Sequence, residues 1–234
     1  MDTFTLPARL PWTGPGPRPR ILIGFCCQGG EAMGYWQAGF DITGIDINPQ
    51  PRFPFTFVQG DAIAYAREHS HTYAAVAGGP PCQGYSLTHR IHSNDHPRLI
   101  AQFREVVAGL GKPYVIENVE EARAELHNPV LLCGAMAGFG LHTYRHRLFE
   151  TNWPLTAPDH PGHGDHLVKM GRPLEPGDWY HAVGNFSGVP YVRADMGVPW
   201  MNRDGIRECI PPAYARHIGT QLLNHLAATR TAAA

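Results

Sequence analysis

Short apolar segments alternate with helical segments through the first half of the chain, and this alternation restricts the possible folds more than any other feature. Apolar segments typical of buried strands lie at residues 20–26, 42–46, 56–61, 73–77 and 112–117, and helical segments at about 31–38, 62–69 and 97–110. Parallel strands need crossover connections, so strands alternating with helices predict a parallel sheet covered on both faces. We therefore expect an α/β fold, a three-layer αβα arrangement of the Rossmann-like type.

Polar or reactive residues stand at the carboxyl ends of the predicted strands. They are the segment from Phe25 to Gly30, and then Asp46, Asp61, Cys82 and Glu117. Open parallel sheets bind their ligands at the carboxyl ends of the strands. We therefore expect these side chains to share one edge of the sheet and to form the functional site.

The size and charge of the chain fit one large domain carrying a small insert. The chain has 234 residues and a formal net charge of −1, so any surface for nucleic acid must be local. We expect residues 1–150 to form the catalytic and cofactor-binding core. Residues 151–200, rich in His, Gly and Pro, would be a small insert, and residues 201–234 a helical segment that returns to the core.

Five cysteines are present, and no two of them form a C-x-x-C pair, which argues against zinc. The odd count and the lack of a signal peptide fit a reducing cytoplasm. No segment approaches the roughly 18 apolar residues of a membrane span. His160, His163 and His166 have neither helical spacing nor cysteine partners, so we interpret them as solvated loop residues and expect no metal.

The sequence Gly78-Gly79-Pro80-Pro81-Cys82-Gln83-Gly84-Tyr85-Ser86 places a thiol on a sharp turn after a strand. Most free cysteines are small, inert core residues. Two consecutive prolines cannot continue a sheet ladder, so Cys82 is not expected inside a strand. A thiol on a rigid turn at a strand end suits a nucleophile.

The first strand, turn and helix resemble a nucleotide-binding unit. Glycines such as Gly29 and Gly30 permit close backbone approach, and a helix N-terminus favours negative charge. Asp46 stands where a ribose hydroxyl binds in such folds, and Asp61 could accept from an adenine amino group. Each aspartate alone is more often a helix N-cap, but the pair on successive strands favours a nucleoside-bearing cofactor.

Glu117 and two arginines are the remaining candidates. A carboxyl group at a strand end is partly desolvated, which raises its pKa and lets it hold a proton, although a salt bridge is the ordinary alternative. Arg145 and Arg147 are expected on one short strand with both side chains on one face, where they could steady an anion. A solvated strand edge is the alternative for this pair.

Together, these segments resemble the DNA cytosine-5 methyltransferase family of the small bacterial or phage type, and they stand in the family's order. Gly79-Pro80-Pro81-Cys82-Gln83 with Ser86 matches the P-C-Q motif, and Glu117-Asn118-Val119 matches E-N-V. Phe25 to Gly30 resembles the cofactor loop, Tyr144-Arg145-His146-Arg147 the Q-x-R-x-R motif, and Pro211-Pro212-Ala213-Tyr214-Ala215 the closing P-P-x-x-A segment. The chain departs from the family pattern at Ile23, Cys27, Asp46, Tyr144, His146 and Arg207-Glu208.

The resemblance implies methyl transfer from S-adenosylmethionine to carbon 5 of a flipped cytosine, with S-adenosylhomocysteine as product. It gives Cys82 the role of nucleophile on carbon 6 and Glu117 that of a protonated partner of ring N3. Asn118 would hold the loop, Arg147 would contact the O2 side of the base, and Arg145 would support the catalytic loop. The implied cofactor-binding residues are Phe25, Cys26, Gln28, Gly29, Gly30, Asp46, Ile47, Asp61, Ala62 and Pro80.

The resemblance also places a target-recognition region at residues 151–200, which is short for that role. Double-stranded DNA is the implied partner, with a cognate restriction endonuclease as a possible second one. The candidate DNA contacts are Gln83, Ser86, His89, Arg90, Lys169, Arg172 and Arg193. For the aromatic residues of the insert, packing in a small core is the favoured role. Two other functions stay open: cytosine-5 methylation of a structured RNA, and a non-catalytic DNA-binding relative.

Overall fold

A seven-stranded sheet forms the centre of the computed structural model, with strand order β3-β2-β1-β4-β5-β7-β6. The structure describes residues 4–82, 84, 98–164, 167–169 and 171–232. The pairs among the first five strands are parallel, whereas β7 pairs antiparallel with both β5 and β6. The strands are β1 (Arg20–Gly24), β2 (Asp41–Asp46), β3 (Thr56–Gln59), β4 (Ala75–Gly78), β5 (Tyr114–Asn118), β6 (Val130–Leu132) and β7 (Arg147–Thr151).

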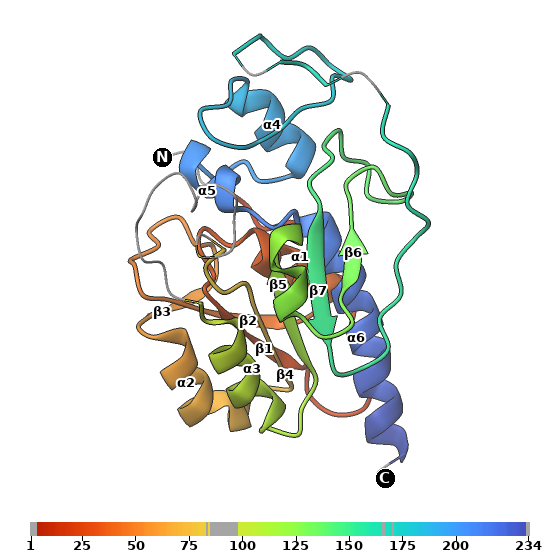
Figure 1. The fold of residues 1–234 in the computed structure, drawn as a ribbon. Helices are drawn as coiled ribbons and strands as arrows, with labels where there is room; N and C mark the ends of the chain where they lie inside the picture. Colours follow the sequence, from red (N-terminus) through yellow and green to blue (C-terminus); the bar gives the residue numbers. More distant parts are fainter. Residues whose placement is uncertain (1–3, 83, 85–97, 165–166, 170, 233–234) are drawn as a thin grey trace.

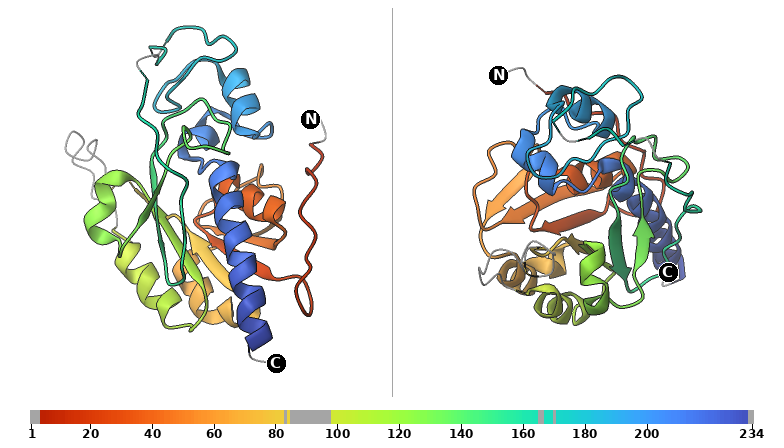
Figure 2. Two further views of the ribbon diagram at one scale, coloured as in Figure 1. Left: turned by 90° about the vertical axis from the view of Figure 1, so that its right-hand side faces the viewer. Right: turned by 45° about the horizontal axis from the view of Figure 1, so that its top comes forward.

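Helices cover both faces of the sheet, as Figures 1 and 2 show. Helices α1 and α6 lie together on one face, and α2 and α3 pack on the other. The helices are α1 (Gly30–Ala38), α2 (Ala62–His69), α3 (Ile100–Ala108), α4 (Val189–Met196), α5 (Arg203–Glu208) and α6 (Pro212–Ala232), with short 3₁₀ helices η1 (Ser70–Thr72) and η3 (Glu120–Glu125). The α/β three-layer fold predicted from the sequence is confirmed.

Alternate residues of β1 enter two different hydrophobic cores. Ile21 and Ile23 are buried in the core under α1 and α6, whereas Leu22 is buried in the core under α2 and α3. Side chains of a strand alternate between the faces of the sheet, so a central strand covered on both faces must be apolar throughout. This requirement explains why the run at residues 20–26 is uninterrupted.

A third, smaller core belongs mainly to the segment 180–209. Tyr180, Phe186, Trp200 and Met201 are buried in it, and Met33 of α1 belongs to the same core. The expected packing role of these insert aromatics is therefore confirmed. In Figure 1 the insert with α4 and α5 stands above the carboxyl ends of the parallel strands. The division at residues 150 and 200 stays a prediction; β7 crosses the first boundary.

The proline-rich arm before β1 lies against the end of α1. The Leu10 amide donates to the Gln37 carbonyl at 2.9 Å, and Arg9 pairs with Asp41 at 2.6 Å. The arm therefore lies as an extended segment along the domain. Within the described part of the chain, no helix has the length and apolar character needed to cross a membrane.

Glu150 of β7 forms a buried ion pair beneath α3. Its two carboxylate oxygens each accept from Arg104 at 2.7 Å, and they also accept from the Tyr114 hydroxyl and the His127 amide. Burial alone would raise the pKa of Glu150, but the hydrogen bonds from Arg104 and from the His127 amide outweigh it, so the pKa lies below its ordinary value. The ionised carboxylate is therefore the form that stabilises the fold.

We expect Glu150→Gln to lower the free energy of unfolding by about 3–5 kcal/mol, because it leaves the Arg104 guanidinium buried without its counter-charge. Urea denaturation at pH 7 measures this loss. A lowered folded-state pKa contributes stability above the unfolded value of 4.5 and loses it as the pH falls through the folded value. The difference in the free energy of unfolding between the wild type and Glu150→Gln should therefore shrink below pH 4.5. Glu105→Gln, at an exposed position of α3, is the control and should change little.

Candidate active site

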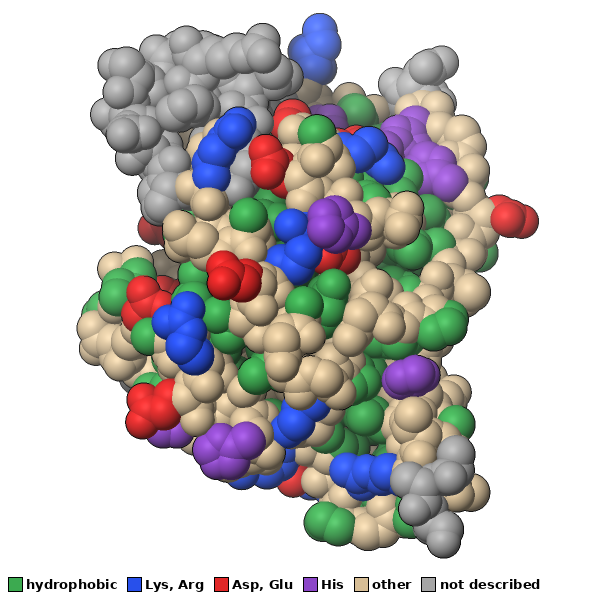
Figure 3. Space-filling view, turned by 60° about the horizontal axis from the view of Figure 1, so that its bottom comes forward, with side chains coloured by type: hydrophobic (Ala, Val, Ile, Leu, Met, Phe, Trp, Pro, Cys, Tyr) green, Lys and Arg blue, Asp and Glu red, His purple; other side chains and the backbone are tan. Residues whose placement is uncertain are grey.

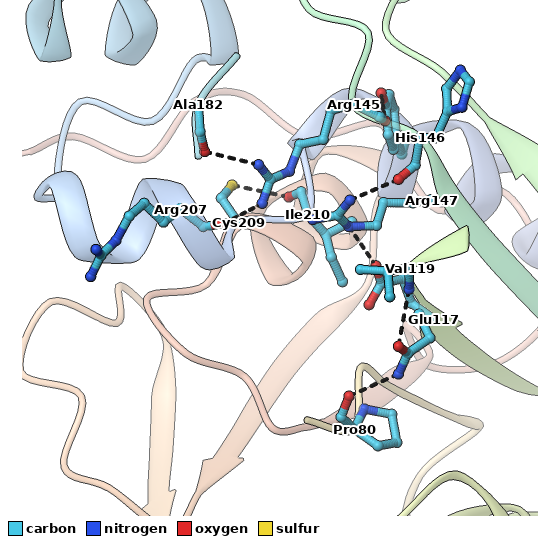
Figure 4. Close-up of polar contacts among 12 residues, drawn as sticks. Pro80, Glu117, Val119, Arg145, His146, Arg147, Ala182, Arg207, Cys209 and Ile210 are labelled. Atoms are coloured by element: carbon cyan, nitrogen blue, oxygen red, sulfur yellow. Dashed lines mark hydrogen bonds and ion pairs between the residues drawn. The ribbon is translucent and has the colours of Figure 1, made fainter. Parts of the chain in front are cut away.

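The thiol loop begins where β4 ends and is tied to the end of β5. The Asn118 side-chain amide donates to the Pro80 carbonyl at 2.9 Å, and its oxygen accepts from the Val119 amide at 3.0 Å (Figure 4). Asn118 is 1% exposed, so both contacts are shielded from water. Cys82 follows Pro80-Pro81 and is half-buried. The geometry therefore gives Asn118 a loop-holding position.

Glu117 and Arg147 face each other across neighbouring strands. The Arg147 Nε lies 2.9 Å from the Glu117 Oε1. Figure 4 shows the two side chains pointing toward each other. Glu117 is 7% exposed. Burial raises the pKa of the Glu117 carboxyl above its ordinary value, and Arg147 and Arg145 only partly oppose this shift. Both sequence-based interpretations of Glu117 therefore apply. The carboxyl group pairs with Arg147, and its raised pKa makes it easier to protonate than a carboxyl group in water.

Arg145 precedes β7 instead of lying in it, which corrects the expectation that both arginines share a strand. Its side chain is buried and donates to the carbonyls of Ala182 and Arg207 (Figure 4). Its own carbonyl accepts from the Tyr214 hydroxyl at 2.7 Å. Arg145 therefore joins the insert and the segment before α6 to the site, while Arg147 alone of the pair lines the cavity.

Asp46 holds the cofactor-type loop through its backbone. One carboxylate oxygen accepts from the Cys27 amide and the other from the Asn48 amide, both at 3.0 Å. Phe25 and Cys27 have positive φ values of 55° and 44°, a conformation that non-glycine residues rarely adopt. Cys27 replaces a glycine of the family pattern, and the hydrogen bond from its amide to Asp46 helps to hold this unfavourable conformation.

Several residues expected to bind cofactor also make packing contacts in the structure, and their contacts with cofactor stay predictions. The Gln28 side chain pairs with Asn202, at 2.8 Å through its nitrogen and 3.1 Å through its oxygen. A Cβ on Gly30 would lie 2.6 Å from the Ile210 carbonyl oxygen, so the glycine permits close approach of the segment before α6. Cys26 and Ala62 are buried in the two main cores, and a Cβ on Gly29 would meet Phe53.

Asp61 caps helix α2. Its Oδ1 accepts from the amides of Ile63 and Ala64 at 2.8 and 2.9 Å. The N-cap, which the sequence favours for an aspartate considered alone, is therefore present. Asp61 lines a cavity of about 240 Å³ with Phe25 and Arg67, separate from the one that contains Asp46. Its proposed contact with adenine stays a prediction.

One cavity of about 250 Å³ brings part of the predicted site together. The residues that line it from the predicted set are Phe25, Asp46, Ile47, Pro80, Cys82, Glu117 and Arg147. They come from the ends of β1, β2, β4, β5 and the start of β7. A larger cavity of about 430 Å³, lined by α4 and α6 residues such as Asp195 and Arg216, contains none of them. The edge of the sheet therefore brings Asp46, Cys82 and Glu117 to one cavity, whereas Asp61 lines another.

Four polar residues of this cavity were not predicted from the sequence: Asn48, Gln50, Arg207 and Glu208. Asn48 follows Asp46 by two positions, so it belongs to the same strand end. Arg207-Glu208 was visible only as a departure from the family pattern before Pro211-Pro212. The fold brings this pair to the cavity because α5 packs beside the cofactor-type loop through Asn202 and Gln28.

The predicted nucleic-acid contacts are divided between the insert and the thiol loop. Lys169 and Arg172 are exposed, whereas the Arg193 guanidinium is engaged with the Met201 carbonyl at 2.5 Å. Gln83, Ser86, His89 and Arg90 lie outside the described residues, as does His166. On the face shown in Figure 3, basic and acidic side chains are interspersed, in line with the near-zero net charge.

Burial and Glu117 raise the pKa of the Cys82 thiol, and Arg147 and Arg145 partly oppose the rise. A raised thiol pKa means a smaller thiolate fraction at neutral pH. We therefore expect alkylation of Cys82 by iodoacetamide to increase with pH and to reach its midpoint above the ordinary thiol range. Arg147→Ala should move that midpoint up and Glu117→Gln should move it down; peptide mass spectrometry over a pH series measures each. Shifts in the opposite directions would contradict this electrostatic assignment.

Solved structures with the same architecture include two methyltransferases. The Entamoeba histolytica methyltransferase EhMeth aligns with a TM-score of 0.60 at 12% identity, over 90% of this chain and 99% of that chain. The S. pombe Dnmt2 methyltransferase aligns with a TM-score of 0.59 at 14% identity, with the same coverage. This chain has the methyltransferase fold.

The likeness at these identities is one of fold. No model of a known protein family matches the sequence, and no curated protein matches it significantly. The seven-stranded sheet with β7 antiparallel to β5 is the Rossmann-like arrangement of the methyltransferase fold. In this methyltransferase fold the 250 Å³ cavity occupies the edge where ligands of open α/β sheets bind.

Proposed function

We propose that this protein transfers a methyl group from S-adenosylmethionine to carbon 5 of cytosine in double-stranded DNA. One observation carries the proposal: Cys82, Glu117 and Arg147 line the same cavity as Phe25, Asp46 and Ile47. A nucleophile, a carboxyl group with a raised pKa and a cofactor-type loop are thus within one small space. This arrangement suits nucleophilic catalysis with general acid support.

The cofactor side of the cavity fits a nucleoside-bearing sulfonium compound. Asp46 and Glu208 supply carboxylates, which favour a cationic ligand. Ile47 is apolar and 65% exposed at the cavity, so a flat base could cover it. S-adenosylmethionine would supply an electrophilic methyl group and leave as S-adenosylhomocysteine. Asp46, Ile47 and Phe25 are the residues that would hold it.

Cys82 and Glu117 then have different roles in the proposed reaction. The Cys82 thiolate forms a bond to cytosine carbon 6, which places an electron pair at carbon 5. Glu117 in its protonated form donates to ring N3, where negative charge develops. After methylation, carbon 5 gives up its proton to a base, and Cys82 leaves as thiolate when the ring double bond returns. The target atom is inaccessible in a stacked duplex, so the cytosine must be flipped out.

Arg147 and Asn118 keep this arrangement in place. Arg147 contacts Glu117 and, in the proposal, the O2 side of the base. Asn118 ties the end of β5 to the Pro80 carbonyl, so the carboxyl group and the thiol loop keep their relative position. Side chains locked by buried hydrogen bonds are the usual means of keeping catalytic groups in position.

DNA is proposed as the substrate from the motif resemblance and from the position of the insert. The insert stands above the strand carboxyl ends (Figure 1), and its Lys169 and Arg172 are exposed for phosphate contacts. The proposal also includes the type of enzyme, a small bacterial or phage one that acts in the cytoplasm, and a cognate restriction endonuclease as its second partner. A structured RNA is the second candidate, because the catalytic chemistry would be the same.

Covalent trapping tests the proposal. The protein is incubated with S-adenosylmethionine and duplex DNA carrying 5-fluorocytosine, in which loss of the carbon 5 substituent is blocked. We expect a denaturation-resistant adduct that is absent with Cys82→Ser. An adduct only with fluorinated RNA would assign the RNA substrate. Binding without any adduct would assign the protein to the non-catalytic class and overturn the proposed reaction.

A further inference from the structure

Four metal-binding side chains from three separate segments converge at the edge of the sheet. They are Cys133 directly after β6, His146 directly before β7, and His160 and His163 of the strap, which we define as residues 152–164. Their ligand atoms all lie within 4.8 Å of one another. His160 and His163 were expected to be solvated loop residues without cysteine partners, but the fold brings them to Cys133.

The distances within this cluster resemble those between ligands of one metal ion. The Nε2 atoms of His160 and His163 lie 3.1 and 3.2 Å from the Nε2 of His146, and the Cys133 Sγ lies 3.4 Å from the His163 Nε2. In a tetrahedral zinc site, Zn–N and Zn–S bonds of about 2.0 and 2.3 Å place neighbouring ligand atoms roughly 3.3–3.5 Å apart. These three distances are therefore close to those of a tetrahedral site, and the other ligand atoms are at most 4.8 Å apart.

A carboxylate outside the cluster fixes the chemistry of His146. The His146 Nδ1 lies 2.5 Å from the Glu120 Oε2. A carboxylate accepts, so Nδ1 must carry the hydrogen, and in the neutral ring Nε2 then presents a lone pair. The single Nε2 lone pair of His146 cannot accept good hydrogen bonds from both other imidazoles, whereas one metal ion can bind all three rings. Carboxylate–histidine pairs of this kind orient the ligands of zinc sites.

We propose that Cys133, His146, His160 and His163 bind one Zn²⁺ ion in a structural site. One thiolate and three imidazoles suit a borderline-soft ion, and four protein ligands leave no open position for catalysis. Binding forms four coordinate bonds and releases the Cys133 thiol proton to solvent. Cys133 is fully buried, with its sulfur beside His163, so the thiolate would be shielded by the strap.

The ion would fasten the strap to the β6–β7 hairpin. The other end of the strap is already held on α6, where the Thr156 carbonyl accepts from Gln221 at 3.0 Å. His146 stands between the two site arginines, and its carbonyl accepts from Arg147 at 2.7 Å. The proposed ion would thus also fix the backbone from which Arg147 reaches Glu117. Loss of the ion should loosen the strap first.

Metal analysis of the full chain tests the site. After dialysis against metal-free buffer, we expect about one equivalent of zinc per chain. Replacement by Co²⁺ should give the intense visible bands of tetrahedral cobalt together with a thiolate-to-cobalt charge-transfer band. The charge-transfer band should be lost with Cys133→Ser and retained with Cys82→Ser. Wild-type protein that binds neither ion, or cobalt spectra of octahedral type, would overturn the proposal.

Histidine variants provide the matched comparison. The double variant His160→Ala/His163→Ala should lose at least nine-tenths of the bound zinc, and it should be cut sooner in the strap by a protease. His71→Ala, at an exposed histidine of η1, should keep the metal. Zinc retained by the double variant would contradict the assignment. Should the double variant not fold, the cobalt spectrum of the wild-type chain decides the question alone.

Discussion

Cys82→Ser should abolish methyl transfer, with turnover lowered by more than about 1,000-fold. A serine hydroxyl in this half-buried position is a far weaker nucleophile than a thiolate, so the bond to carbon 6 would not form. The side chains differ by one atom, and the loop is held by the Asn118 contact to Pro80, so the fold should persist. Transfer of labelled methyl groups to DNA measures turnover, and calorimetry measures S-adenosylmethionine binding.

Cys27→Ser is the matched control, because Cys27 lines the same cavity. Its backbone amide, not its thiol, makes the contact to Asp46. We expect turnover within a few-fold of wild type for this variant. If Cys82→Ser kept a tenth or more of the wild-type rate, covalent catalysis by Cys82 would be the wrong mechanism.

Glu117→Gln should lower turnover by about 100- to 10,000-fold while the dissociation constant of S-adenosylmethionine changes little. The amide is nearly isosteric but cannot lend a proton to ring N3, and it replaces the salt bridge to Arg147 with a neutral contact. The raised pKa of Glu117 means that its acid form persists to higher pH than that of an ordinary carboxyl group. Activity of the wild type should therefore decline as the pH rises through that raised value.

Glu121→Gln in the exposed part of η3 is the control for this variant. Initial rates at saturating cofactor and calorimetric titration of S-adenosylmethionine separate catalysis from binding. Equal losses of turnover and of cofactor affinity in Glu117→Gln would assign Glu117 a structural role and remove it from the reaction.

Sequence reasoning placed the strands and the site edge because those features depend on local patterns. β1 and β4 must be apolar on both faces, and the residues after each strand end necessarily meet at one edge. The same reasoning wrongly placed Arg145 in one strand with Arg147. The two arginines are two positions apart, which is the spacing of side chains on one face of a strand. In the fold Arg145 turns away to the carbonyls of Ala182 and Arg207, which are distant in sequence.

The cofactor-type loop shows where local patterns fall short. Gly29 and Gly30 look like residues that admit a ligand, yet their missing Cβ atoms admit Phe53 and the Ile210 carbonyl. Gln28 looks available for binding, but Asn202 engages it on both polar atoms. These partners come from other parts of the chain, so only the tertiary structure reveals these contacts, and the cofactor contacts of the three residues stay a prediction.

The sequence by itself determined the layered α/β fold and the edge that collects Cys82, Glu117 and Asp46, because strand periodicity and chain direction are local properties. The tertiary structure alone decided which side chains share a cavity, and it added Glu208 to them. It alone also brought Cys133 to the three histidines. Such clusters form where segments that are distant in sequence pack together, and the spacing of residues along the chain does not reveal which segments do so.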